Sequence, residues 1–408
     1  MTTTINNEHK KLNVPNLRFP EFQGKWEKTK FGDIATGFDY GMNAAAKNYD
    51  GVNKYIRITD IDEASSTYTD KDIVSPDGIL TDNYLVNNRD ILLARTGAST
   101  GKSYLYKKTD GKLYYAGFLI RANVTTHDPY FVFSQLHTHR YWRWVSIMSA
   151  RSGQPGINSQ EYSSFPIYTT SIEEENKIAK LLSLLDERIA TQNKIIEKLE
   201  SLIKGLNDSL YVRYGDDIRT SFAELGYSYS GLSGKSAGDF GTGKPFITYL
   251  NVYSNNVVNE NDYQYVQIDE GEKQNVVQYG DVLFTLSSET PEEVGIGSVY
   301  LGQDEVYLNS FCFGVHIVNE ELAYPPYISY YVSSTPFRKF IYPFAQGSTR
   351  FNLCKADFEK ASITLPSLDN QKRIHSVLNS ITMKINTERA MLEQYVTQKQ
   401  HLLRQMFI

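Results

Sequence analysis

The stretch SIEEENKIAKLL, residues 171–182, returns 196 positions later as SLDNQKRIHSVL, residues 367–378. In both copies apolar residues follow one another in steps of four and three, and the pattern continues downstream. This spacing is typical of helices that pack along an apolar seam. We therefore expect two long helices, over residues 171–213 and 367–408. Ser171 and Glu174 have the spacing of a capping box at the start of the first.

The seam is defined by apolar positions in the two segments, interrupted at Gln192, Glu388 and Lys399. The positions expected to line it as a coiled coil are Ile178, Leu182, Leu185, Ile189, Ile196, Leu199, Ile203, Ile374, Leu378, Ile381, Ile385, Leu392 and Leu402.

Each helix could pack on its own domain, or the two could pack on each other. Because a domain separates two matched helices, the sequence favours an antiparallel pair, in which Lys399 would lie near Asp186. About 35 residues of helix would span roughly 50 Å.

The repeat covers the rest of the chain as well. FGDI (31–34) returns as FAEL (222–225), and DILL (90–93) returns as DVLF (281–284), both at an offset of 191. Short apolar runs broken by Gly, Asn and Asp predict strands, with one helix per copy beginning near Pro129 and Pro325. We expect an α+β chain with a pseudo-twofold internal repeat: two similar mixed α/β domains joined by the two long helices.

The expected divisions are a flexible tail (1–16), a first domain (17–170) and a second domain (214–366), with the long helices at 171–213 and 367–408.

Composition narrows the class of protein. With 408 residues, 41% of them hydrophobic, and two cysteines, the chain fits a reducing cytoplasm and permits no disulfide framework. No run is long and apolar enough for a membrane span, and the N-terminus has no secretory pattern. The seven histidines form no metal pattern, and no set of nucleophile and base indicates catalysis. Residues 211–366 carry 10 basic against 19 acidic side chains, which a nucleic-acid hypothesis must accommodate.

The glycine-rich stretch RTGASTGKS, residues 95–103, has one residue too few for a P-loop, and a strand rather than a helix is expected after it. We interpret it as a strand, a glycine turn and a strand, with Arg95, Thr96 and Lys102 exposed at the tip.

Several segments resemble the DNA-specificity subunit of type I restriction-modification systems. They are LRFP (17–20) with Trp26 and FGD (31–33), then FPIYTTSIEEENKIAKLLSLLDERI (165–189) and ITLPSLDNQKRIHSVL (363–378). The resemblance implies two target-recognition domains, each reading half of a bipartite DNA site. It also implies that the long helices act as spacer and bind two methyltransferase subunits.

The same resemblance places the chemistry on other chains. The methyltransferase subunits would carry S-adenosylmethionine and methylate adenine, while restriction/translocase subunits would use ATP and magnesium. This chain would have no catalytic activity, cofactor or metal of its own.

Base-reading residues are expected in loops, because Arg suits guanine while Asn and Gln suit adenine. The candidates in the first domain are Arg57, Thr59, Arg95, Lys102, Arg151, Gln154 and Asn158; those in the second are Lys244, Thr248, Asn251, Gln346, Thr349, Arg350 and Asn352.

Two alternatives remain open from the residues alone. The duplicated domains could bind proteins rather than DNA, as a scaffold. The chain could also be a fused restriction-modification enzyme, which would need cofactor and nuclease motifs of its own.

Overall fold

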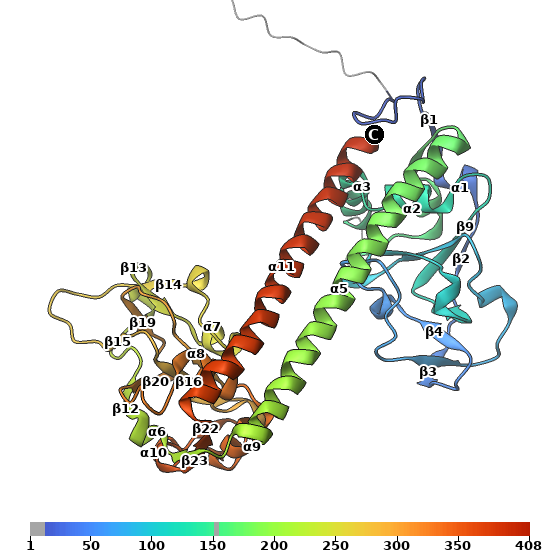
Figure 1. Ribbon diagram of the computed structural model, residues 1–408. Coiled ribbons are helices and arrows are strands. Elements are labelled where there is room, and N and C mark those ends of the chain that lie inside the picture. The colour runs from blue at the N-terminus through green and yellow to red at the C-terminus, as the bar shows by residue number, and fades with distance from the viewer. Residues whose placement is uncertain (1–12, 151–154) are drawn as a thin grey trace, which may run out of the picture. The chain divides into compact units, whose positions relative to one another are not determined.

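The computed structural model describes residues 13–150 and 155–408. The chain divides into two compact units, each with its own hydrophobic core (Figure 1). Unit 1 contains residues up to 193 and residues 390–408, and unit 2 contains residues 194–389. Each long helix therefore belongs to both units, with about one half of its length in each.

Unit 1 is built on an antiparallel sheet in the order β2 (Ala35–Tyr40), β9 (Leu119–Val124), β6 (Asp90–Ala94) and β7 (Ser103–Leu105). Strand β6 is completely buried because its sequence, DILLA, faces the core on both sides of the sheet. The remaining strands form three pairs: β1 (Glu27–Lys30) with β10 (Pro166–Thr169), β3 (Ala45–Asn48) with β5 (Val74–Asp77), and β4 (Lys54–Ile56) with β8 (Leu113–Tyr115).

Helices cover this framework. They are α1 (Phe31–Ile34), α2 (Pro129–Gln135), α3 (His139–Ser149) and α4 (Ser159–Ser163), with the start of α5 (Ile172–Tyr214) and the end of α11 (Leu368–Met406). The rings of Trp26, Phe131 and Phe407 pack together with centroid distances of 5.3–6.1 Å, which joins the two ends of the chain in one core.

Unit 2 repeats the main sheet in the same order: β12 (Gly226–Ser230), β20 (Cys312–Ile317), β16 (Val282–Thr285) and β18 (Gly297–Val299). A second sheet has the order β14 (Gln264–Val266), β13 (Phe240–Ile247), β19 (Val306–Leu308) and β15 (Val276–Val277). A third has the order β17 (Ser287–Ser288), β22 (Phe351–Leu353) and β21 (Ala345–Gln346), and β11 (Ile218–Thr220) pairs with β23 (Ile363–Leu365).

The helices confined to unit 2 are α6 (Phe222–Leu225), α7 (Tyr249–Ser254), α8 (Pro325–Tyr331), α9 (Thr335–Ile341) and α10 (Lys355–Lys360). Helices α2 and α8 begin at the expected prolines. The expectation of a single helix there is wrong, since each copy continues into a second helix. Thr138 and Ser334, at equivalent positions, cap the starts of α3 and α9 with their side chains.

Buried polar contacts recur at equivalent positions in the two units. Asp90 accepts from the backbone N–H of Asn87 at 2.6 Å, and Asp281 accepts from that of Gln278 at 2.9 Å. Burial raises the pKa of both carboxyls. Hydrogen bonds satisfy both carboxyl groups. The two copies of the repeat therefore share a buried polar contact as well as sequence.

The two long helices lie side by side in opposite directions within each unit. In unit 1, Asp186 of α5 pairs with Lys399 of α11 at 2.6 Å, and the Arg188 guanidinium lies 6.0 Å from the centre of the Tyr395 ring. In unit 2, Arg389 of α11 pairs with Glu200 of α5 at 2.5 Å. The expected proximity of Lys399 to Asp186 is confirmed.

The thirteen apolar seam positions predicted from the sequence are all buried or half-buried. Ile178 and Leu182 join the core of unit 1, whereas Ile374 and Leu378 join the core of unit 2. Each helix therefore packs on the core of its unit and also lies against the other helix. Both of the arrangements considered from the sequence are present. Within the described residues no helix has an apolar stretch long enough to cross a membrane.

The start of α5 is capped only partly as expected. Ser171 Oγ accepts from the backbone N–H of Glu174 at 3.4 Å, but the Glu174 carboxylate accepts from Arg18 and from Thr170. Glu174 thus ties the N-terminal segment to the helix instead of completing a capping box.

Candidate nucleic-acid interface

The residue that follows strand β6 organises the candidate surface of unit 1. Arg95 donates from its backbone N–H to Phe118 O at 3.0 Å and accepts at its carbonyl from the N–H of Ile157 at 2.9 Å. The next residue, Thr96, forms an antiparallel bridge with Gly156. Because the backbone is held on both sides, the Arg95 side chain projects from a fixed base.

Around Arg95 lies a small hollow of about 240 Å³, with Thr96 and Asn158 on its walls. The Arg95 guanidinium lies 4.7 Å from the centre of the Tyr40 ring, and Tyr40 is 43% exposed. A guanidinium stacked on an aromatic ring keeps most of its donors free for an external partner. The structure thus brings Arg95 and Asn158 together, as a base-reading surface requires.

Asn158 serves two purposes. Its amide oxygen accepts from the N–H of Glu161 at 2.9 Å and so caps α4, while the residue stays exposed. An Asn that accepts one hydrogen bond in this way keeps both amide N–H donors and the second lone pair of its oxygen for a base.

The corresponding surface of unit 2 is the small sheet β17–β22–β21. Asn352 stands opposite Ser287 on one side and Gln346 on the other. The Arg350 guanidinium donates to Ser287 Oγ at 3.2 Å. Gln346, Thr349, Arg350 and Asn352 are all exposed, so this sheet gathers four of the predicted candidates.

The backbones of the two surfaces are hydrogen-bonded in the same way. Leu353 donates its N–H to Leu286 O at 2.8 Å, just as Ile157 donates to Arg95 O at 2.9 Å. Leu286 occupies the repeat position of Arg95, so the guanidinium of unit 2 comes instead from Arg350. The same framework therefore presents a different set of polar groups in each unit.

An anion also lies beside the surface of unit 2. Glu293 accepts from Tyr253 Oη at 2.8 Å and from Ser288 Oγ at 2.9 Å. These hydrogen bonds, from Tyr253 above all, lower the pKa of the carboxyl, so it is ionised at neutral pH. A carboxylate can accept a hydrogen bond from the amino group of cytosine.

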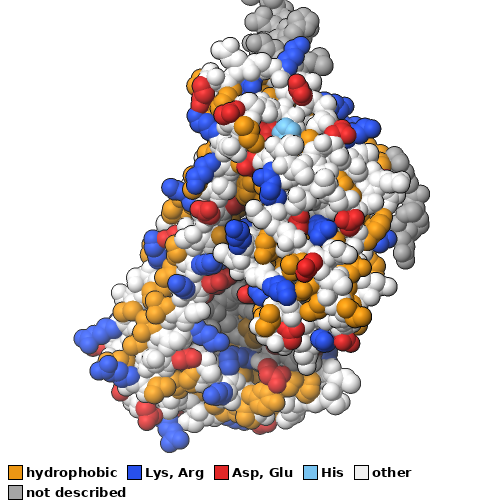
Figure 2. All heavy atoms as spheres, turned by 90° about the vertical axis from the view of Figure 1, so that its right-hand side faces the viewer, with side chains coloured by type: hydrophobic (Ala, Val, Ile, Leu, Met, Phe, Trp, Pro, Cys, Tyr) orange, Lys and Arg blue, Asp and Glu red, His pale blue; other side chains and the backbone are white. Residues whose placement is uncertain are grey.

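On the face drawn in Figure 2, Lys and Arg side chains are interspersed with Asp and Glu.

Three predicted basic residues pair with acidic side chains of the same chain. Arg57 contacts both carboxylate oxygens of Asp60 at 2.8–2.9 Å and Asp72 at 3.0 Å, and the hydrogen bond to Asp60 above all raises its pKa. Lys102 pairs with Glu63 at 3.1 Å. The expectation that Arg95, Thr96 and Lys102 are exposed at a tip is wrong, since all three are half-buried. Lys244 pairs with Glu305 at 3.3 Å on an exposed strand.

Asn251 is wrong as a base-reading candidate. It is 0% exposed, and its amide group donates to Asn259 O at 2.9 Å and to Asp262 O at 3.3 Å. Its neighbour Thr248 caps α7, accepting from the Asn251 N–H at 3.1 Å, and remains half-buried. Thr59 is exposed within a single 3₁₀ turn, and its hydroxyl donates to Asp60 at 3.4 Å. Arg151 and Gln154 lie outside the described residues.

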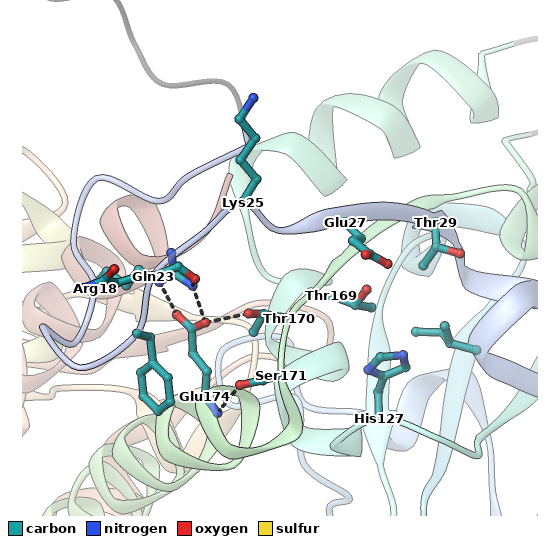
Figure 3. A pocket seen from close by; sticks show the side chains of 12 residues that line it. Arg18, Gln23, Lys25, Glu27, Thr29, His127, Thr169, Thr170, Ser171 and Glu174 are labelled. Carbon is teal, nitrogen blue, oxygen red and sulfur yellow. Dashed lines mark hydrogen bonds and ion pairs between the residues drawn. The ribbon is translucent and has the colours of Figure 1, made fainter.

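A larger cavity of unit 1, about 460 Å³, has a structural role (Figure 3). Glu174 is almost fully buried there, and its two carboxylate oxygens accept from Arg18 at 2.7 Å each. On the neighbouring turn His127 lies 2.8 Å from Glu175. The Arg18–Glu174 pair fastens the N-terminal segment to α5, and the His127–Glu175 contact fastens the segment before α2 to the same helix. Among residues 13–150 and 155–408 no cluster of three or more His, Cys, Asp or Glu side chains is arranged to hold a metal ion.

Comparison with known protein families shows which family carries these two surfaces. The family model for the type I restriction modification DNA specificity domain matches residues 23–201 and again residues 235–395. The chain belongs to this family. It is a DNA-specificity subunit, and the two matches fall on the two copies of the repeat.

Relatives of this specificity subunit match it over almost its whole length. A sequence assigned as the type I restriction enzyme MjaX specificity subunit of Methanocaldococcus jannaschii is 25% identical over 431 residues, covering 97% of this chain and 96% of the relative. The solved S subunit of a type I system from M. genitalium shares 14% identity, 97% and 99% coverage and a TM-score of 0.57. A chain from a study of type I system assembly and conformational transition shares 16% identity, 93% and 96% coverage and a TM-score of 0.55.

Sequence reasoning missed two polar members of the specificity subunit's surfaces, Tyr40 and Ser287. Ser287 could have been found from the repeat, since it lies 191 residues after Thr96. Tyr40 could not, because nothing local distinguishes a strand-end tyrosine that stacks on Arg95 from the other tyrosines of the chain.

Proposed function

We propose that this specificity subunit recognises a bipartite DNA site, with one half read by each recognition domain, residues 17–170 and 214–366. The observation that carries the proposal is the matched framework around Arg95 and Ser287. In both units the segment after the central strand is bonded to the segment before a short helix, and both present exposed polar side chains there. One framework with two sets of side chains suits two different half-sites.

The first half-site would be read by Arg95 and Asn158, and the second by Gln346, Arg350 and Asn352. Other candidates would lie at the margins of the two reading surfaces: Thr59, Lys102, Lys244, Thr248 and Thr349. Arg57 would hold its own segment together through Asp60 and Asp72. Specific bidentate contacts of this kind discriminate bases by about 1–3 kcal/mol each.

The helices over residues 171–213 and 367–408 would form an antiparallel coiled coil that sets the spacing of the half-sites. Two methyltransferase subunits would bind to it, and restriction/translocase subunits would join the complex. The opposed ion pairs Asp186–Lys399 and Glu200–Arg389 support the pairing of the helices within each unit.

Chemistry would remain on the partner chains. S-adenosylmethionine would be bound by the methyltransferase subunits, and ATP and magnesium by the restriction/translocase subunits, so that this chain contributes recognition without catalysis. Phosphate contacts from the methyltransferases would offset the excess of acidic residues in 211–366.

The test is to produce the chain together with its methyltransferase partner and map methylated adenines in the host genome. We expect one bipartite motif that disappears when this chain is omitted. Exchange of residues 214–366 for the second domain of a relative should change one half of the motif and leave the other. Methylation without a motif, or a motif independent of this chain, would contradict the proposal.

A further inference from the structure

A tight turn that borders the recognition surface is the same in both units. In unit 1 the backbone N–H of Leu119 donates to Ala116 O at 2.8 Å; in unit 2 that of Cys312 donates to Asn309 O at 3.0 Å. The third residue of each turn is phenylalanine, Phe118 or Phe311.

Each of these turns is fixed to the strand that carries the recognition residues. Phe118 O accepts from the Arg95 N–H at 3.0 Å, and Phe311 O accepts from the Leu286 N–H at 2.9 Å. The chain crosses close by at a glycine: a Cβ on Gly41 would lie 2.2 Å from Ala116 O. A Cβ on Gly231 would likewise lie 2.1 Å from Asn309 O. The turn therefore cannot shift without disturbing its sheet.

The two phenylalanine rings nevertheless remain uncovered. Phe118 and Phe311 are each 58% exposed, although their backbones are held rigidly. A single exposed apolar side chain needs no explanation. Two at equivalent positions, equally exposed and each beside a surface with a guanidinium, indicate a shared task.

The residues that flank the two turns on the neighbouring strands differ: the Phe118 carbonyl accepts from Arg95, and Tyr40 stands opposite Ile120 on β9. The equivalent positions at Phe311 are Leu286 and Ser230. Groups that read base identity are expected to differ between two half-sites. A side chain that is kept in both surfaces should act in a way that does not depend on the base sequence.

We propose that Phe118 and Phe311 are apolar wedges that press between neighbouring bases, one in each half-site. A benzyl ring has no hydrogen-bonding atom, so the contacts that it can make with a base are with a thymine methyl group or with the face of the base. The face of a base is common to all sequences, and Phe is among the residues that partially unstack base steps. The inference rests on the proposed function, because it needs DNA at these two surfaces.

The experiment uses the complex with the methyltransferase subunits and a duplex carrying the methylated motif. Phe118→Ala and Phe311→Ala should each weaken binding between about fivefold and 150-fold, the range expected for loss of one base–aromatic contact. The preferred sequence should stay the same. Val318→Ala removes an exposed apolar side chain from the other end of β20 and should bind as the unaltered complex does.

A second readout separates a wedge from a methyl contact. 2-Aminopurine placed in turn along each half-site, apart from the adenine that the methyltransferase flips out, should brighten at one step when the unaltered complex binds. That signal should vanish in the half contacted by the altered phenylalanine and remain in the other half. Phe→Leu at either turn should retain part of both affinity and signal.

Unchanged affinity and an unchanged 2-aminopurine signal in both alanine variants would overturn the wedge, as would a loss seen only when thymine occupies one position. Failure of the unaltered complex to prefer its own motif would overturn the proposed function first, and this inference with it.

Discussion

The ammonium group of Lys399 lies 2.6 Å from the Asp186 carboxylate, which also accepts a hydrogen bond from the Tyr130 hydroxyl. The residues are 213 positions apart in sequence and meet because α5 and the end of α11 run in opposite directions within unit 1. Both charged side chains are partly exposed, at 21% and 28%. Water therefore screens the pair, which serves more to set the register of the helices than to stabilise them.

A double-mutant cycle measures that contact. Asp186→Ala and Lys399→Ala should couple by about 0.5–1 kcal/mol in urea unfolding, the range for partly exposed pairs. Asp186→Ala alone should cost more than Lys399→Ala, because it also leaves the Tyr130 hydroxyl without its acceptor. Strictly additive losses would show that the two side chains do not interact in solution.

Arg95→Ala and Arg350→Ala test the two reading surfaces. Each should lower affinity by about 1–3 kcal/mol and relax the preference at one position, in a different half of the motif for each variant. Binding of the methyltransferase complex to a panel of single-base variants of the site provides the measurement. Arg57→Ala is the matched control, since Asp60 and Asp72 occupy its donors, and it should leave base preference intact. Equal preferences in all three variants would argue against this assignment.

Asn251→Ala should act on stability and leave recognition unchanged. The substitution truncates a fully buried side chain and takes hydrogen-bond partners from part-buried backbone groups of Asn259 and Asp262, for a cost of about 1–3 kcal/mol. Thermal unfolding should show the loss, while base preference well below the transition stays that of the unaltered chain. Asn352→Ala, at an exposed position, should give the reverse pattern. An altered motif with undiminished stability would restore Asn251 as a base reader.

Glu175 and Gln371 occupy equivalent positions in the two units, but neither residue can replace the other without loss of hydrogen bonds. Glu175 accepts from the backbone N–H groups of Asp128 and Thr170, whereas Gln371 accepts from that of Tyr324 and donates to Leu322 O and Pro366 O. Gln371→Glu would set a buried carboxylate against two carbonyl oxygens, so unfolding of unit 2 should be easier by several kcal/mol. Gln371→Met, which removes the charge, should be the milder change. A Glu variant as stable as the natural chain would show that the site admits water.

His137 makes the stability of unit 1 depend on pH. Burial above all, and the nearby charge of Lys399, lower the pKa of His137 to about 4 from its usual 6.5. The unfolded chain therefore takes up a proton below about pH 6.5 while the folded chain does not, so stability falls as the pH drops from 6.5 towards 4. His137→Asn should flatten the part of the unfolding profile in that window. Parallel profiles for both proteins would mean that His137 titrates normally.

The sequence by itself determined the architecture to a large extent. The repeat offset predicted two similar domains, and the period of Ile178, Leu182, Ile374 and Leu378 predicted two long helices whose apolar faces are buried. It even predicted the contact between Lys399 and Asp186. These features were accessible because helix period and repeat register are local properties of the chain: once two seams are aligned, the positions that face each other follow.

Only the tertiary structure decided which polar side chains are free. Asn251 is buried and bonds to backbone groups of its own unit. Arg57 and Lys102 pair with acidic side chains, and the Arg95 guanidinium stacks on Tyr40 near Asn158. Their residue types made all of them equally good candidates. A polar side chain carries no local mark of its partner, because that partner is brought to it by strands and turns distant in sequence. The exposed rings of Phe118 and Phe311 could not be foreseen for the same reason, since exposure depends on what the rest of the fold leaves uncovered.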